Sequence, residues 1–281
     1  MQLLQKAERK QALIKLALQG PSGSGKTYSS LLLANGLVAN WNHIAVIDTE
    51  NNSSHLYSHL GSYNVLSLSE PFSPERYIEA IEACEKAGMK AVIIDSISAE
   101  WEGSGGIIET HGNMAGNSFT NWNRITPRHN AFVQKILQSP SHIIATIRSK
   151  QDYVLTDKNG KMVPEKVGLK GVTRDGMDYE FTVVLDIDIK HQATASKDRT
   201  GLFTNPLPFM ITEQTGNKIR LWCIGEDLIK NVEVQINEAK TVQELRNIII
   251  KYPTLRKDIE PLCINRKAQI EGVVTDQVVN P

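Results

Sequence analysis

The chain has 281 residues, of which 41% are hydrophobic and 22% charged, and its 31 Lys and Arg residues balance 31 Asp and Glu residues. This composition is typical of a globular protein and excludes wholesale disorder. Zero net charge excludes a generally basic nucleic-acid binder but leaves room for a local basic surface. The polar N-terminal segment lacks the apolar region of a signal peptide. No stretch approaches the roughly 20 apolar residues of a membrane span.

The three cysteines, Cys84, Cys223 and Cys263, are an odd number at wide spacings. They form neither a disulfide framework nor a zinc-binding pattern. Free thiols suit a reducing compartment, so we expect a cytoplasmic protein that makes no membrane contact.

Five short apolar runs have the length and residue types of buried strands. They are Leu13–Leu18, His43–Asp48, Ala91–Asp95, His142–Ile147 and Phe181–Ile187. Segments with helical spacing separate the first four runs, namely Tyr28–Val38, Pro74–Ala87 and roughly Asn121–Leu137. This alternation predicts an α/β fold with a mainly parallel sheet, in which functional residues gather at the carboxyl ends of the strands.

Residues 102–121 and 149–178 have no clear period. The second stretch contains Asn159-Gly160 between two apolar runs, a pattern that indicates a hairpin. From Gly225 the pattern becomes helical, with Val242, Leu245, Ile248 and Ile249 on one face and breaks expected at Pro253 and Pro261. We therefore predict a core over residues 1–224, with a basic hairpin insertion at 148–178, and a small helical module over 225–281 with a frayed end.

The strongest motif is the run at residues 20–27, which has the form G-x-x-x-x-G-K-[ST], follows an apolar strand and opens a helix. Its glycines let successive backbone N–H groups face phosphate oxygens, and the helix adds its positive N-terminus. We expect Lys26 to reach the β- and γ-phosphates of ATP and the Thr27 hydroxyl to bind Mg²⁺. The predicted nucleotide-binding residues are Gly20, Pro21, Ser22, Gly23, Ser24, Gly25, Lys26, Thr27 and Tyr28.

The run Ala91–Asp95 ends in an acidic residue, the usual form of the partner that a phosphate loop needs to orient its magnesium ion. We predict that Asp95 holds a magnesium-bound water and so completes the metal site with Thr27. Many P-loop ATPases carry a catalytic carboxylate directly after this Asp, but here Ser96 occupies that position. The general base must therefore come from another segment.

Glu50 is the predicted general base, with Asp48 in support, because it follows the second strand, which we place beside the phosphate loop. Glu100 and Glu102 are rival candidates on the segment after Asp95. A carboxylate acts as a base only within hydrogen-bond reach of the attacking water. The sequence does not give this distance, so all three carboxylates stay candidates.

Two features follow the fourth strand. Thr146 is predicted to sense the γ-phosphate, and the window from Arg148 to Arg174 carries seven cations and three acids. A local excess of +4 attracts a phosphate backbone, and Tyr153 could stack on a base; the alternative is an ordinary solvated hairpin. The candidates for binding single-stranded DNA are Arg148, Lys150, Tyr153, Lys158, Lys161, Lys166 and Lys170.

Three cations are candidates for neutralising transition-state charge across a subunit interface, as an arginine finger does. They are Arg174, Lys197 and Arg199.

Three segments resemble the RecA-like ATPases. The segment Ile47-Asp48-Thr49-Glu50 is similar to the RecA segment whose Glu activates water, and Val92-Ile93-Ile94-Asp95-Ser96 is similar to its magnesium-binding strand. Thr146-Ile147-Arg148 resembles the sensor segment, in which that family has Gln where this chain has Thr146.

A closer resemblance, over about residues 10–205, is to phage-encoded AAA-type ATPases, some of which are classed as RecA-like single-strand annealing recombinases. It is carried by residues 95–103, 148–150, 167–170, 174–176, 179–181 and 197–201, together with the phosphate loop. This resemblance implies a RecA-like P-loop NTPase core, binding to single-stranded DNA and a role in phage recombination or replication, within an infected or prophage-carrying bacterial host.

The leading hypothesis is an ATPase that binds single-stranded DNA and assembles into a ring or filament, with a single-strand DNA-binding protein as a further candidate partner. A P-loop kinase of a small acceptor is the second hypothesis, in which residues 149–178 would form the lid. The third is an adaptor that binds ATP without hydrolysing it and recruits replication or recombination proteins.

Overall fold

The computed structural model describes residues 12–158, 161–204 and 207–272, except for the side chains of residues 151–167, 226, 227 and 254. Contacts divide these residues into two compact units, one over Leu13–Arg220 and one that begins at Leu221. The division falls inside helix α6 (Glu213–Ile224), close to the predicted end of the core.

A single sheet of nine strands organises the first unit, as far as the chain is described. Its order is β3 (Asn64–Ser67), β2 (Ile44–Asp48), β4 (Ala91–Asp95), β5 (His142–Lys158), β1 (Lys15–Gly20), β7 (Val183–Ile187), β8 (Gln192–Asp198) and β9 (Phe209–Met210), with β6 (Lys161–Gly171) on β5. The six strands from β3 to β7 pair in parallel, while β8, β9 and β6 pair antiparallel. The predicted α/β fold with a mainly parallel sheet is confirmed.

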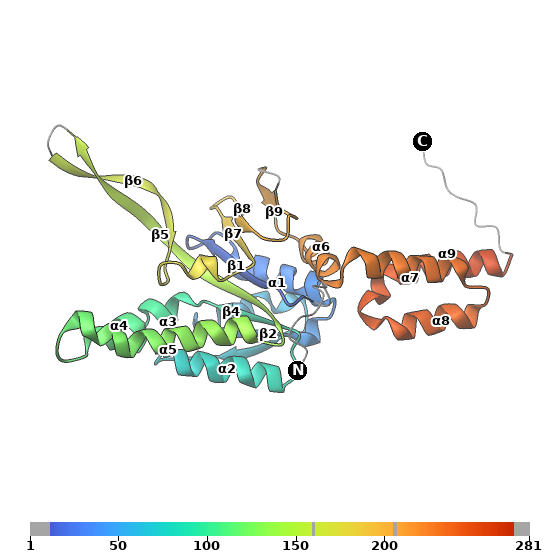
Figure 1. Cartoon of the computed structure of the whole chain (residues 1–281), viewed down its shortest axis with the longest axis horizontal. Coiled ribbons are helices and arrows are strands. Elements are labelled where there is room, and N and C mark those ends of the chain that lie inside the picture. The colour runs from blue at the N-terminus through green and yellow to red at the C-terminus, as the bar shows by residue number, and fades with distance from the viewer. Residues whose placement is uncertain (1–11, 159–160, 205–206, 273–281) are drawn as a thin grey trace, which may run out of the picture. The chain divides into compact units, whose positions relative to one another are not determined.

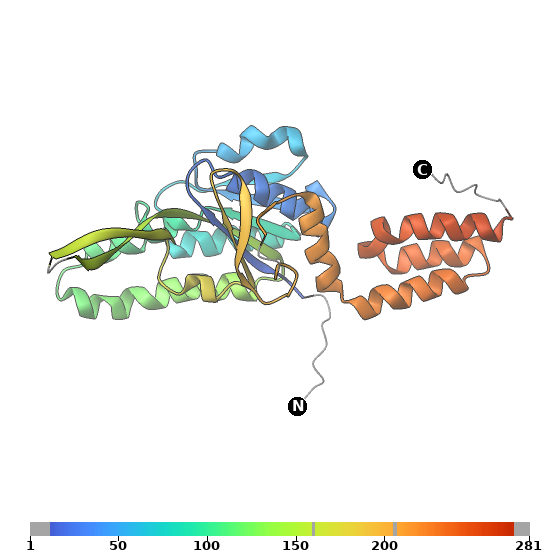
Figure 2. The same ribbon diagram turned by 90° about the horizontal axis from the view of Figure 1, so that it is seen from above.

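Helices cover both faces of this sheet, and Figure 2 shows α1 (Lys26–Val38) on one side and α5 (Ser118–Gln138) on the other. Helix α2 (Pro74–Lys86) packs beside α5, where the rings of Tyr77 and Phe132 lie 5.2 Å apart. The central strands β2 and β4 are buried along their whole length. Burial on both faces explains why these strands are continuous apolar runs in the sequence.

Strand β5 belongs to two pairings. From His142 to Arg148 it lies between β1 and β4, and from Ser149 onward it pairs with β6 in a two-stranded ribbon that leaves the sheet (Figure 1). The pair Lys158–Lys161 closes this ribbon, so the predicted hairpin is confirmed, although its turn residues lie outside the described part. The predicted strand His142–Ile147 was too short, because β5 continues into the hairpin as far as Lys158.

Shorter elements complete the unit. They are η1 (Trp41–His43), η2 (Ser53–Leu60), α3 (Ser98–Glu102), α4 (Ile107–Gly112) and η3 (Met177–Tyr179).

The second unit contains α7 (Glu226–Glu238), α8 (Val242–Lys251), η4 (Pro253–Leu255) and α9 (Arg256–Ile270). Its buried core includes Val232, Leu245, Ile248, Ile259 and Cys263. The expected break at Pro261 was wrong, because this residue lies inside α9. Burial of Ile259 and Cys263 on either side of it offsets the backbone hydrogen bond that proline removes. The end predicted to fray, residues 273–281, lies outside the described part.

Within the described ranges, no helix is both long and apolar enough to cross a membrane.

Candidate nucleotide-binding site

The phosphate loop joins the end of β1 to the start of α1. Gly25 caps α1 at its N-terminus with φ of 85°, a left-handed conformation that favours glycine. A Cβ atom at Gly20 would lie 2.4 Å from the carbonyl oxygen of Ile187 in β7. Glycine is therefore required at one position by backbone conformation and at the other by close packing of the loop on the sheet.

Lys26 lies against the loop that precedes it. Its Nζ donates hydrogen bonds to the carbonyl oxygens of Gly20 and Pro21, each at 2.9 Å. Burial lowers the pKa of Lys26, and the nearby carboxylates of Asp95 and Glu50 oppose this shift. The ammonium group is thus held at the loop, where phosphate oxygens would be stronger partners than carbonyls.

Asp95 lies at the centre of a hydroxyl cluster. One carboxylate oxygen accepts a hydrogen bond from Thr27 Oγ1 at 2.6 Å, and the other accepts one from Thr146 Oγ1. The residue is only 1% exposed, and this burial raises its pKa, while the two hydroxyl hydrogen bonds lower it. Asp95 and Thr27 therefore meet as the sequence predicts.

The donor set around Asp95 fits Mg²⁺. A carboxylate and a hydroxyl are the hard oxygen ligands that this ion takes, and it usually keeps waters and substrate phosphates as its other ligands. The buried hydroxyls of Ser24 and Ser96 have no hydrogen-bond partner in the described structure. No group of three or more His, Cys, Asp or Glu side chains that could hold a metal ion occurs among the described residues.

One cavity of about 640 Å³ contains the groups of this site. The phosphate loop lines it together with Asp95, Glu50, Glu102 and Arg148. Its volume lies within the roughly 300–1,000 Å³ of small-molecule sites.

Glu50 lines this cavity although its strand, β2, is not the neighbour of β1 in the sheet. The expected position of β2 beside the phosphate loop was wrong, because β4 and β5 lie between β2 and β1. Glu50 instead extends from the segment after β2 and accepts a hydrogen bond from Arg148 Nε at 2.9 Å. Asp48 supports this segment, since its carboxylate accepts hydrogen bonds from the backbone N–H groups of Glu50 and Ser54, each at 2.8 Å.

The two rival carboxylates differ in position. Glu100 is 1% exposed and contacts His129 Nδ1 at 3.0 Å, and it does not line the cavity. Glu102 does line the cavity, and its carboxylate lies 3.8 Å from Lys150 Nζ. Glu50 and Glu102 therefore remain within the site, and Glu100 belongs to a buried contact behind it.

A family model described as an AAA domain matches residues 12–214. The chain belongs to this AAA domain family. Its members are AAA-type P-loop ATPases, which in general bind ATP with Mg²⁺. The match includes the phosphate loop, Asp95 and the hairpin and ends at the start of α6. No curated protein matches the chain.

The AAA domain also uses residues that sequence reasoning missed. Tyr57 lines the cavity and lies edge-on to Tyr28, with ring centroids 5.8 Å apart. His191 lines it as well, and its Nδ1 lies 2.9 Å from the carbonyl oxygen of Ser24. His191 stands in the turn after β7 with φ of 65°, and no periodic pattern marks such a turn residue as part of a site.

Thr146 of the AAA domain is completely buried and lies behind Asp95, outside the lining of the cavity. It contacts the Asp95 carboxylate, so any sensing of the γ-phosphate would pass through Asp95.

The candidate DNA-binding residues of the AAA domain divide into three groups. Arg148 lines the nucleotide cavity, Lys170 lines a second cavity at the base of the hairpin, and Lys150 lines both. The side chains of the remaining four lie outside the described part; they are Tyr153, Lys158, Lys161 and Lys166.

The three candidate trans-acting cations lie outside the nucleotide cavity of their own chain. Arg174 Nη2 contacts Thr126 Oγ1 at 3.4 Å. Lys197 and Arg199 donate hydrogen bonds to the carbonyl oxygen of Tyr179. Lys197 pairs with Val184, at the end of β7 opposite the one that touches the phosphate loop.

Proposed function

We propose that this AAA domain hydrolyses ATP and acts on single-stranded DNA as a homo-oligomer, in phage recombination or replication through annealing or strand pairing. The observation that supports hydrolysis most directly is the single cavity that Lys26, Thr27, Asp95 and Glu50 share. These four side chains come from the start of α1, the end of β4 and the segment after β2, and together they supply phosphate binding, a metal site and a base.

The chemistry is water attack on the γ-phosphorus. Backbone N–H groups of the loop and Lys26 bind the phosphates, and Thr27 and Asp95 would hold Mg²⁺, which when bound neutralises phosphate charge. Glu50 accepts a proton from the attacking water, whose oxygen bonds to the γ-phosphorus while the bond to the β-phosphate oxygen breaks. ADP and phosphate leave. Arg148 orients the Glu50 carboxylate through their hydrogen bond.

The oligomer is supported by the position of Lys197 and Arg199, since they lie away from their own cavity. A head-to-tail contact between subunits would bring such cations to the neighbour's nucleotide and would build a ring or a filament.

Single-stranded DNA is supported by the basic hairpin and by the resemblance to phage recombinases. The sequence of strands β5 and β6 has a local excess of positive charge, and the ribbon that they form leaves the sheet (Figure 1). A local positive excess attracts a phosphate backbone.

Calorimetry and phosphate release, measured with Mg²⁺ and with or without an oligonucleotide, test this function. We expect Lys26→Ala to lose ATP binding. Glu50→Gln should bind ATP but release phosphate about 10²- to 10⁴-fold more slowly. Wild-type turnover in both variants would contradict the mechanism. Phosphate transferred to a nucleoside instead of released would favour a kinase, and tight binding without turnover would favour an adaptor.

A further inference from the structure

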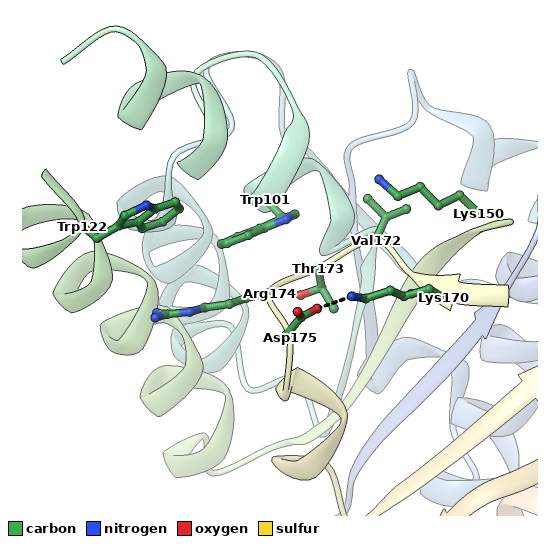
Figure 3. Close-up of a pocket in the computed structure, with 9 residues that line it drawn as sticks. Trp101, Trp122, Lys150, Lys170, Val172, Thr173, Arg174 and Asp175 are labelled. Carbon is green, nitrogen blue, oxygen red and sulfur yellow. Dashed lines mark ion pairs between the residues drawn. The ribbon is translucent and has the colours of Figure 1, made fainter. Parts of the chain in front are cut away.

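A second cavity, of about 500 Å³, lies beside the nucleotide cavity and has no part in the mechanism above. Lys150 and Val172 line both cavities. Its walls come from α3, α5, the base of the hairpin and the segment that follows β6 (Figure 3).

One end of this cavity is aromatic. The indole of Trp101 on α3 and that of Trp122 on α5 lie 6.1 Å apart and within 22° of parallel, and Trp122 also stacks on His111 at 4.1 Å. Both indoles are only partly buried and line the cavity, so each presents part of its ring to a ligand. A pair of near-parallel aromatic faces is a platform on which a nucleobase stacks regardless of its sequence.

Three of the four charged residues that line the cavity are cationic. Figure 3 shows the guanidinium of Arg174 on the same side as the indoles, and Lys150 and Lys170 on the opposite side. One acid is present, Asp175, which pairs with Lys170 at 2.7 Å, but both side chains are about half or more exposed, so the pair is weak. The cavity thus has an aromatic end suited to a base and a cationic end suited to phosphate.

The aromatic end is held rigidly from behind. Trp101 lies edge-on to His129 with ring centroids 5.7 Å apart, and His129 is itself fixed by the buried carboxylate of Glu100 at 3.0 Å. A stacking platform needs this support, because an indole free to rotate would lose conformational entropy on binding.

We propose that this cavity binds one unstacked nucleotide of single-stranded DNA, with its base on Trp101 and Trp122 and its phosphates near Lys150 and Lys170. The inference rests on the proposed function, since it gives the DNA partner a specific site. Because the base must leave its stack to enter, the cavity selects single strands over duplexes.

The test is oligonucleotide affinity. We would titrate a fluorescein-labelled oligothymidine, longer than about 16 nucleotides, with the full chain and a non-hydrolysable ATP analogue, and follow its anisotropy. Trp101→Ala and Trp122→Ala should each weaken binding about 5- to 150-fold, Trp101→Phe should retain most of it, and ATP affinity should not change. Trp41→Phe is the matched control, because Trp41 packs against Tyr63 away from the cavity.

A second measurement does not depend on the folding of the alanine variants. The chain has four tryptophans, so the double variant Trp41→Phe/Trp222→Phe leaves Trp101 and Trp122 as its only indoles. Their fluorescence should be quenched by the oligothymidine and not by a duplex of equal length.

Unchanged affinity in the alanine variants, or absent quenching, would overturn the cavity as a DNA site while leaving DNA binding elsewhere on the protein. If the variants change particle mass instead of affinity, the cavity takes a second copy of the chain and the inference is also wrong. If the wild-type protein binds no oligonucleotide at all, the proposed DNA partner itself fails.

Discussion

Arg148 Nε donates a hydrogen bond to Glu50 Oε1 at 2.9 Å and so links β5 to the segment after β2, where both residues line the nucleotide cavity. The two residues are 98 positions apart in the chain. Their side chains are 48% and 30% exposed, so the pair contributes little to stability. Its effect is to fix the orientation of the carboxylate that we propose as the base.

Replacing Arg148 with Ala should therefore change turnover more than stability. Without its partner, Glu50 samples other rotamers, and we expect kcat for ATP hydrolysis to fall about 10- to 100-fold with little change in KM. Steady-state phosphate release and thermal unfolding measure the two effects. As a comparison, Glu102→Gln should lower kcat less than Glu50→Gln does; the reverse order would make Glu102 the base.

Asp95→Asn should weaken Mg²⁺-dependent ATP binding without lowering the stability of the fold. The amide loses the negative charge that a magnesium site needs, so ATP affinity measured with Mg²⁺ should fall at least about tenfold, while affinity in EDTA changes little. Because burial raises the pKa of Asp95 in the free protein, removing its charge should leave the melting temperature equal or higher. A lower melting temperature without nucleotide would contradict this account of the buried carboxylate.

The sequence predicts the parts of this site that depend on local patterns. The apolar run Ala91–Asp95 forms β4 with the predicted ends, and Lys26, Thr27 and Asp95 meet because the carboxyl ends of parallel strands share one edge. Strand order is not a local property, and the insertion of β5 between β1 and β4 follows from the packing of the whole sheet. Strand β3, at the edge, was missed because its residues are half or fully exposed and lack an apolar pattern.

Residues that reach a site from a turn or across a cavity are also hidden from the sequence. His191 is placed by a tight turn after β7, in which the Asp188 carboxylate accepts hydrogen bonds from the backbone N–H groups of Lys190 and Gln192. Trp101 and Trp122 meet because α4 packs against both α3 and α5. No sequence spacing or periodic pattern shows that His191 lies in the nucleotide site or that Trp101 lies beside Trp122.

The contact between Glu100 and His129 should be a stabilising element and no part of the hydrolytic chemistry. Burial raises the pKa of Glu100, and the His129 hydrogen bond lowers it. His129→Ala leaves a buried carboxylate without its partner, and we expect a loss of about 3–5 kcal/mol of unfolding free energy. Urea unfolding measures this loss. Glu100→Gln should cost less and should retain ATP hydrolysis, and an inactive but folded Glu100→Gln protein would contradict its assignment.

Lys197 and Arg199 give a prediction that depends on the oligomer. The double variant Lys197→Ala/Arg199→Ala and the single variant Lys26→Ala should each be inactive alone. Mixed in equal amounts and allowed to exchange subunits, they should recover up to about a quarter of wild-type turnover, because one head-to-tail interface in four pairs an intact phosphate loop with intact cations. If the mixture stays inactive while light scattering shows mixed oligomers, these cations do not act across the interface.

His142 should make stability depend on pH. Its Nδ1 accepts a hydrogen bond from the backbone N–H of Ile14 at 3.0 Å, and burial, with the nearby charge of Lys15, lowers its pKa from 6.5 to about 4. Between these two values the unfolded chain binds the proton and the folded chain does not, so the free energy of unfolding should fall as pH falls from 6.5 towards 4. The contribution of this one group is at most about 1.4 kcal/mol per pH unit.

His142→Asn keeps an acceptor for Ile14 but cannot titrate. Urea unfolding at pH 5 and pH 6.5 should therefore show a smaller change in the free energy of unfolding with pH for this variant than for the wild type. Equal slopes in the two proteins would mean that His142 is protonated in the folded state as readily as in the unfolded chain.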